Sequence, residues 1–113
     1  MKIRLDKDDI LWSKKVRERD GKCKRCGRKP PYQLQAHHIR PRGRSMTRYD
    51  LSNGITLCAN CHTLQDYAVH RSSNQEAWLV AIIGQKEYDR LEKLSLQYKS
   101  RKKARKEFQL THI

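Results

Sequence analysis

The sequence is poor in aromatic residues and has no long apolar stretch. Of its 113 residues, 36% are hydrophobic and 7% aromatic, which is enough for one small core. The longest apolar run, residues 77–83, is far too short to span a bilayer. Residues 1–10 carry charges where a secretion signal would need an apolar segment. We therefore expect a single domain over residues 1–113 that works in the cytoplasm and does not span a membrane.

Acidic residues are also scarce. The 12 Asp and Glu residues are outnumbered by 26 Lys and Arg, which gives a formal net charge of +14. Such an excess predicts an acidic polymer as partner, and nucleic acid comes first because each contacted phosphate releases condensed counterions. An anionic membrane surface is the weaker alternative.

The few cysteines are arranged in two CxxC pairs. The first pair is Cys23 with Cys26, and the second is Cys58 with Cys61. Four thiolates complete the coordination of one tetrahedral zinc, and this spacing is typical of zinc knuckles. The alternative, a disulfide or a reducible thiol pair, is disfavoured in the cytoplasm. A structural zinc is therefore expected.

Apolar spacing and capping residues predict several helices. The expected helices run from residue 8 or 9 to 20, from 59 to about 70, from 73 to 83, and from 85 onward. The last would continue into the polybasic segment 99–106, which has no clear apolar face. We expect Trp12, Trp78, Leu79 and Ile82 to pack in the core and not to stack on bases.

Between these helices the pattern predicts a β-hairpin. Residues 34–39 alternate as a strand, residues 54–57 form its partner, and the basic segment 40–52 is a long connection. Alternation places Leu34, Ala36 and His38 on one face of the first strand, and Gln35, His37 and Ile39 on the other. The two adjacent histidines would then point in opposite directions.

Three of the five histidines, His37, His38 and His62, lie between or beside the CxxC pairs and are not needed once four cysteines hold a zinc. His62 follows the second CxxC pair directly, and Asp66 lies one helical turn further on. Less specific interpretations exist for each residue. One of His37 and His38 could complete a zinc site, His62 and Asp66 could be surface residues, and Asn53 could serve a left-handed turn with the glycine that follows it.

Residues 23–66 resemble the HNH endonucleases of the ββα-metal type, in the subgroup with a four-cysteine zinc. The resemblance rests on AHHI at 36–39, SNGI at 52–55 and LCANCH at 57–62. It implies an α+β fold: a small ββα-metal (His-Me finger) core with zinc-bound knuckles, flanked by an N-terminal helix and C-terminal helices. It also implies metal-dependent hydrolysis of DNA phosphodiester bonds.

The resemblance assigns roles to individual residues. His38 would be the general base, and His37 and His62 would bind the catalytic ion, with Asp66 as a further ligand and His70 a less expected one. Asn53 would orient His38 or, as in some relatives, reach the metal. Asp66 stands where some relatives carry histidine, and its oxygen favours Mg²⁺ or Mn²⁺, with Ni²⁺ or Zn²⁺ as other candidates.

By analogy with the family, one-metal hydrolysis would nick a DNA strand and leave 5′-phosphate and 3′-hydroxyl ends. Nonspecific contacts to double-stranded DNA are expected from Arg40, Arg42, Arg44, Arg48, Lys99, Arg101, Lys102, Lys103, Arg105 and Lys106. A monomer or weak dimer in a phage or mobile-element setting, such as genome packaging, is the expected context. The competing interpretation is a noncatalytic, zinc-ribbon-like nucleic-acid-binding module; a protein-interaction adaptor fits the charge poorly.

Overall fold

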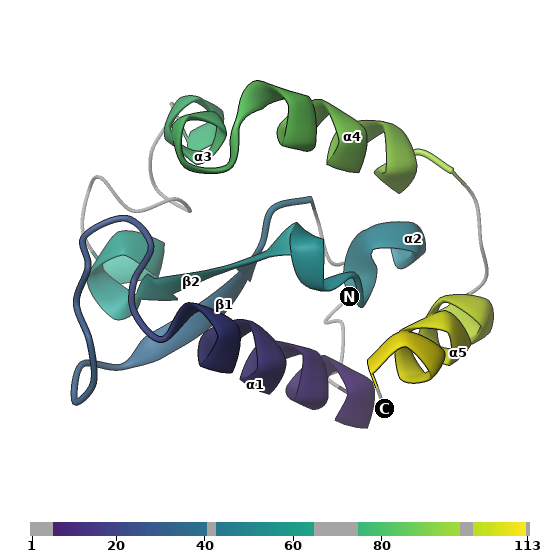
Figure 1. Cartoon of the computed structure of the whole chain (residues 1–113), viewed down its shortest axis with the longest axis horizontal. Coiled ribbons are helices and arrows are strands. Elements are labelled where there is room, and N and C mark those ends of the chain that lie inside the picture. The colour runs from purple at the N-terminus through teal and green to yellow at the C-terminus, as the bar shows by residue number, and fades with distance from the viewer. Residues whose placement is uncertain (1–5, 41–42, 65–74, 98–100, 113) are drawn as a thin grey trace.

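The computed structural model describes residues 6–40, 43–64, 75–97 and 101–112 (Figure 1). Helices surround a two-stranded sheet, and two short helical turns, η1 and η2, flank its second strand. In chain order the elements are α1 (Lys7–Asp20), β1 (Leu34–His38), α2 (Ser45–Arg48), η1 (Leu51–Asn53), β2 (Gly54–Cys58), η2 (Asn60–Leu64), α3 (Gln75–Ile83), α4 (Gln85–Ser95) and α5 (Arg101–His112).

Strands β1 and β2 form the predicted antiparallel hairpin. Leu34 pairs with Cys58 at one end, and His38 pairs with Gly54 at the other. The connection between the strands is more ordered than the sequence suggested, because it contains α2 and η1. The prediction of a plain basic loop over residues 40–52 was therefore wrong, although the hairpin itself is confirmed.

Helix α1 packs along one side of the hairpin and contacts both strands (Figure 1). It begins at Lys7, one or two residues earlier than expected, because Asp6 is its N-cap and forms a reciprocal capping box with Asp9. Gly21, with φ of 68°, ends the helix in the left-handed region. Trp12 and Val16 are buried against the sheet, so the core role predicted for Trp12 is confirmed.

The close approach of α1 to the sheet depends on Gly54. A Cβ atom at this position would lie 2.5 Å from Val16 Cγ2 and 2.7 Å from Trp12 Cζ2. The φ of Gly54 is −116°, which is ordinary extended backbone. The left-handed Asn-Gly turn considered from the sequence was wrong, because this glycine is required for close packing instead.

The hairpin separates two apolar cores. Ile55 and Leu57 face the first, which contains the cysteines and the apolar residues of α3 and α4. Ala36 faces the second, which is built from Trp12, Val16, Tyr49, Ala104 and Phe108. Leu34 departs from the predicted alternation, because it packs against the first core and not on the side of Ala36. Figure 1 shows α3 and α4 on the opposite side of the hairpin from α1.

The C-terminal region differs most from expectation. Gly84, with φ of 92°, separates α3 from α4 as predicted. The next helix does not continue into the basic segment, since α4 ends at Ser95 and α5 is a separate element. Ala104 and Phe108 of α5 are buried in the second core, so this segment does have an apolar face. The predicted cap at Ser73 lies outside the described residues.

Candidate functional site

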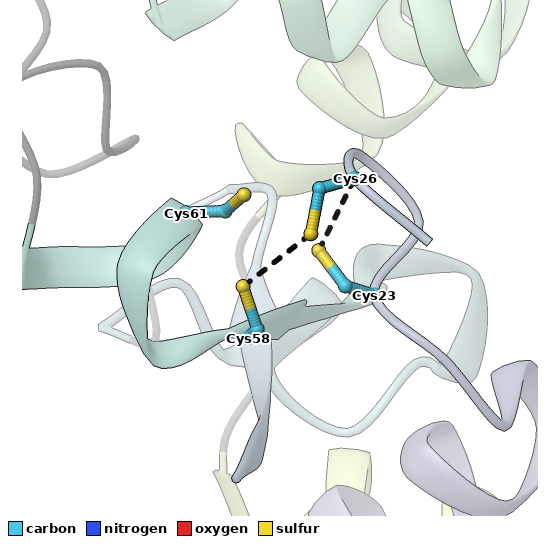
Figure 2. A group of neighbouring side chains, drawn as sticks. All are labelled: Cys23, Cys26, Cys58 and Cys61. Carbon is cyan, nitrogen blue, oxygen red and sulfur yellow. Dashed lines mark hydrogen bonds between the residues drawn. The ribbon is translucent and has the colours of Figure 1, made fainter. Parts of the chain in front are cut away.

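The four cysteines converge from three parts of the chain, as Figure 2 shows. Cys23 and Cys26 lie in the turn after α1, Cys58 ends β2, and Cys61 lies in η2. Their sulfur atoms are all within 4.8 Å of one another, and those of Cys26 and Cys58 are 3.6 Å apart. Sulfurs around a tetrahedral zinc with bonds of about 2.3 Å are roughly 3.8 Å apart. The donor set therefore fits one zinc ion.

The environment of the thiols also suits a cation. Burial raises the pKa of the Cys58 thiol, but hydrogen bonds from the backbone of Cys61 and from neighbouring side chains, including Arg28, outweigh it and lower the pKa to about 6. Burial and the adjacent thiols raise the pKa of Cys61. Four sulfurs this close repel one another as thiolates, and a divalent ion removes that repulsion. Within the described ranges, no other group of three or more His, Cys, Asp or Glu side chains has this geometry.

The three histidines lie on two sides of β1. The His38 ring stacks on Trp12 of α1, with ring centroids 3.9 Å apart and planes at 9°. His37 is 7% exposed and meets His62 in an edge-to-face contact with centroids 5.3 Å apart. The prediction that His37 and His38 point in opposite directions is confirmed. The structure brings His37 and His62 together, and it places His38 against α1.

A hydrogen bond defines the chemistry of His62. Its Nδ1 lies 2.5 Å from Oε1 of Gln35, which is on the same side of β1 as His37. A carboxamide oxygen can only accept, so Nδ1 carries the proton and the lone pair of the neutral ring is on Nε2. A metal-binding histidine typically donates its second ring N–H to an oxygen in this way. Nε2 of His62 is therefore the nitrogen that could bind an ion.

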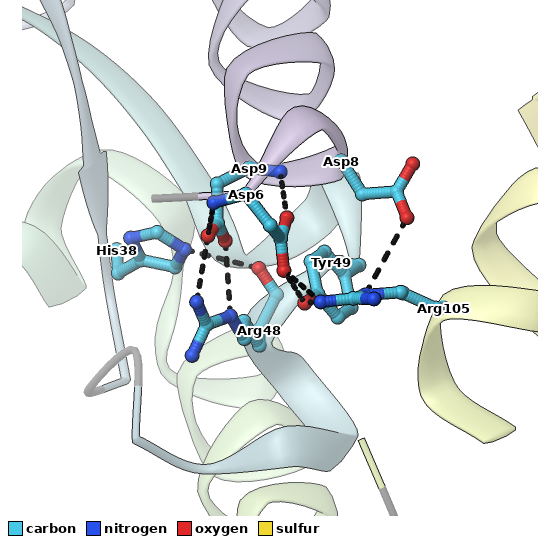
Figure 3. Close-up of polar contacts among 7 residues, drawn as sticks. All are labelled: Asp6, Asp8, Asp9, His38, Arg48, Tyr49 and Arg105. Carbon is cyan, nitrogen blue, oxygen red and sulfur yellow. Dashed lines mark hydrogen bonds and ion pairs between the residues drawn. The ribbon is translucent and has the colours of Figure 1, made fainter. Parts of the chain in front are cut away.

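A second hydrogen bond defines the tautomer of His38 (Figure 3). Its Nε2 donates to the main-chain carbonyl oxygen of Arg48 at 3.0 Å, which leaves the lone pair of the neutral ring on Nδ1. The Arg48 side chain is 4% exposed and forms two hydrogen bonds, of 2.9 and 2.6 Å, with the carboxylate of Asp9. The expectation that Arg48 contacts DNA does not fit this geometry, because its guanidinium is buried and paired.

Asn53 is fully buried and holds the connection between the strands. Its Oδ1 accepts a hydrogen bond from the backbone N–H of Arg40 at 2.8 Å, and its Nδ2 donates to the carbonyls of Thr47 at 3.0 Å and Arg40 at 3.2 Å. Thr47 directly precedes the residue whose carbonyl accepts from His38. This geometry corresponds to the first of the two roles implied for Asn53, that of tying the backbone around His38.

The other predicted site residues are dispersed. Arg44 is exposed, and Arg40 donates to the Tyr88 hydroxyl at 3.0 Å. On α5, Lys102, Lys103 and Lys106 are exposed, whereas Arg105 forms ion pairs with Asp6 and Asp8. For the remaining predicted site or interface residues, the backbone or the side chain lies outside the described part of the structure: Asp66, His70, Arg42, Lys99 and Arg101.

Three contributors to the site were missed from the sequence: Gln35, Trp12 and the pairing of Asp9 with Arg48. Gln35 was placed correctly on the face of His37, and that alternation was the signal that could have linked it to the site. Trp12 was assigned only to the core, because nothing in the sequence around it indicates a contact with His38. Asp9 and Arg48 are 39 positions apart, and no local pattern connects them.

The hairpin, the helical turn after it and the four-cysteine cluster together define a small ββα-metal fold with a zinc site. The family model described as HNH endonuclease matches residues 23–66, and this segment is an HNH domain of the zinc-binding type. The HNH family is generally one of hydrolytic nucleases, so the presence of this segment suggests nuclease activity. No curated protein and no solved structure matches the chain. None of the described helices has the length and apolar character needed to cross a bilayer.

Proposed function

We propose that this protein is a metal-dependent DNA endonuclease that uses His38 as general base. The observation that carries the proposal is the arrangement of three imidazoles within the HNH segment. His37 and His62 meet on one side of β1. His38 is the next residue along the strand, and its hydrogen bond to the Arg48 carbonyl gives its ring a defined tautomer. A noncatalytic binding module would need the cysteines and the basic residues, but not three imidazoles held in this way.

His38 acts on the attacking water. Imidazole takes up and releases a proton near neutral pH more readily than other side chains do, which suits histidine to the role of general base. Because the Arg48 carbonyl holds the proton on Nε2, Nδ1 is the atom that takes the proton from water as the new P–O bond forms. The stack on Trp12 limits rotation of the ring while this happens.

His37 and His62 would hold the catalytic ion, and the hydrogen bond to Gln35 would orient His62 for this task. Asp66, outside the described residues, is the proposed oxygen ligand, and it favours Mg²⁺ or Mn²⁺, with Ni²⁺ or Zn²⁺ as alternatives. A divalent ion at this position supplies charge neutralisation at the phosphate and at the leaving 3′ oxygen. The products are then a 5′-phosphate and a 3′-hydroxyl. One such site in a chain nicks one strand at each encounter.

The DNA is bound through its backbone. The net charge of +14 and the exposed cations Arg44, Lys102 and Lys106 support contacts to phosphates without sequence choice. Affinity for DNA should then fall steeply as salt concentration rises, because binding releases counterions. We further propose that α1, α4 and α5, which pack against the HNH segment, complete one nuclease domain with it over residues 1–113.

Cleavage of supercoiled plasmid tests the function directly. Zinc-loaded protein is incubated with EDTA, Mg²⁺, Mn²⁺, Ni²⁺ or added Zn²⁺, beside the His38→Ala variant. We expect nicked circles with at least one ion, none with EDTA, and a loss of roughly 100-fold or more in His38→Ala without loss of DNA binding. If neither protein cleaves with any ion while both bind DNA tightly at low salt, the noncatalytic module is the better description.

A further inference from the structure

The structure links His38 to a part of the chain outside the HNH segment. We propose that the buried ion pair between Asp9 and Arg48 positions the general base, with Asp9 acting as a positioning residue from α1. This inference rests on the proposed function in one respect, the role of His38 as base. The hydrogen bonds that carry it are independent of that role.

The first step concerns the atom that accepts the hydrogen bond from His38. A neutral imidazole can carry its proton on either nitrogen, and the two forms differ little in energy in water. The carbonyl oxygen of Arg48, 3.0 Å from Nε2, selects one form because it can only accept. The position of this carbonyl therefore favours the form of His38 that carries its proton on Nε2.

The second step is what holds that carbonyl. Arg48 is the last residue of α2, a helix of four residues, which is too short to be stable by its own hydrogen bonds. Its side chain is anchored by two hydrogen bonds to Asp9, and the Thr47 carbonyl before it is anchored by Asn53. Figure 3 shows the Asp9 carboxylate facing the Arg48 guanidinium, with the Arg48 carbonyl turned toward His38.

The third step is the rigidity of Asp9 itself. Asp9 also accepts a hydrogen bond from the backbone N–H of Asp6, so the start of α1 fixes its carboxylate. Three residues further along α1, Trp12 lies against the His38 ring and donates its indole N–H to the Asp50 carbonyl at 2.8 Å. One face of α1 therefore supports His38 twice, through the ring stack and through Arg48.

The burial of this ion pair bears on what the pair contributes to the protein. The Arg48 and Asp9 side chains are 4% and 1% exposed, and removing two charges from water costs so much that an apolar pair of equal size would stabilise the fold equally well. What an apolar pair could not do is fix the direction of a guanidinium through two parallel hydrogen bonds. The geometry therefore serves placement of Arg48 more than stability.

The decisive comparison is Asp9→Asn with Asp8→Asn. Asp8 is a matched control, because it is equally buried, belongs to the same helix turn and pairs with Arg105 at 3.6 Å, whereas Asp9 forms the ion pair with Arg48. The tautomer of His38 is read from long-range ¹H–¹⁵N correlations of the imidazole in zinc-loaded protein without added catalytic ion. Plasmid nicking then gives kcat and KM for the same proteins.

We expect wild type and Asp8→Asn to show the Nε2–H form of His38, and Asp9→Asn to show a mixture of both forms. The kcat of Asp9→Asn should fall roughly 10- to 100-fold with KM for DNA little changed, as expected when a base is misoriented and binding is intact. An Asp9→Asn protein with the wild-type tautomer and the wild-type kcat would overturn the proposal.

Arg48→Lys provides a second variant if Asp9→Asn does not fold. Lysine keeps the charge but cannot form the paired hydrogen bonds, so a mixed tautomer is expected and an unchanged one counts against the proposal. The tautomer measurement needs no cleavage. If wild type shows no nuclease activity, the proposed function fails, while the positioning of His38 by Asp9 is still decided by the spectra.

Discussion

At the scale of single residues, two imidazoles each have one ring nitrogen held by an oxygen atom of the scaffold. His62 donates from Nδ1 to Gln35, and His38 donates from Nε2 to the Arg48 carbonyl. Both acceptors are oxygens that cannot donate, so the tautomers are set by the scaffold and do not depend on a substrate. In the proposed reaction, Gln35 and Arg48 would therefore act on the two imidazoles without contacting the scissile phosphate.

Gln35→Ala tests this control at the proposed metal site. Loss of the Oε1 acceptor leaves the Nδ1 proton of His62 without its partner, and affinity for the catalytic ion should fall roughly 10- to 100-fold. Titration calorimetry with Mn²⁺ on zinc-loaded protein measures this directly. Gln35→Glu retains an acceptor and should bind at least as well as wild type. Equal affinity for Mn²⁺ in wild type and Gln35→Ala would show that Gln35 does not orient a ligand.

At the scale of elements, the parts that were predicted correctly are those with a local signal. The hairpin follows from the strand-like pattern of residues 34–39, α1 from its acidic start and the spacing of Trp12 and Val16, and the zinc site from two CxxC pairs. In α5 the apolar face that packs in the second core includes Ala104 and Phe108, four residues apart among many cations. The polybasic segment considered from the sequence ended at residue 106 and left out Phe108, so its apolar face became evident only from its packing partners.

The contacts that organise the candidate site could not be predicted for a related reason. Asp9 and Arg48 are 39 positions apart in the sequence, and the whole first CxxC pair lies between Trp12 and His38. Charge and aromatic character are visible in the sequence, but the partner of each depends on how α1 lies on the sheet. That placement depends in turn on the glycine at position 54, since a Cβ atom there would collide with Val16 and Trp12.

Phe108→Ala tests whether α5 is an integral part of the fold. Phe108 is 4% exposed and lies near the Tyr49 ring, so its truncation should lower the free energy of unfolding by about 3 kcal/mol. Urea denaturation followed by circular dichroism measures the change. Leu96→Ala is the control, since Leu96 is 65% exposed and its truncation should cost less than about 0.5 kcal/mol. Equal stability of the two variants would mean that α5 does not contribute to the core.

At the scale of the whole molecule, the zinc site joins segments that would otherwise be held by little apolar surface. It connects the turn after α1 to the end of β2 and to η2, and its cysteines form part of the first core. The chain is short and only 36% hydrophobic, so burial alone leaves a narrow margin of stability. A closed zinc site contributes its binding free energy to folding because the unfolded chain has no preformed site.

Cys58→Ser should therefore unfold the protein. Structural zinc in small domains is worth on the order of 10 kcal/mol, which equals or exceeds the net stability of a typical domain. Metal analysis should find about one zinc per chain in wild type and much less in the variant, and circular dichroism should show the loss of helix. Lys24→Ser is the matched control, because Lys24 is exposed in the same turn as Cys23 and its backbone N–H, which bonds the Thr56 carbonyl, is retained.

The same experiment separates the two kinds of metal that the proposal requires. A strong chelator should unfold wild type as Cys58→Ser does, because it removes the structural ion. Gln35→Ala or His38→Ala should keep the zinc and the fold, because their side chains act at the other site. If Cys58→Ser stayed folded with a full complement of zinc, the four sulfurs would not be the site of the structural ion. The imidazoles on β1 and η2 would then be the candidates to hold the structural ion, and the argument for a separate catalytic centre would fail.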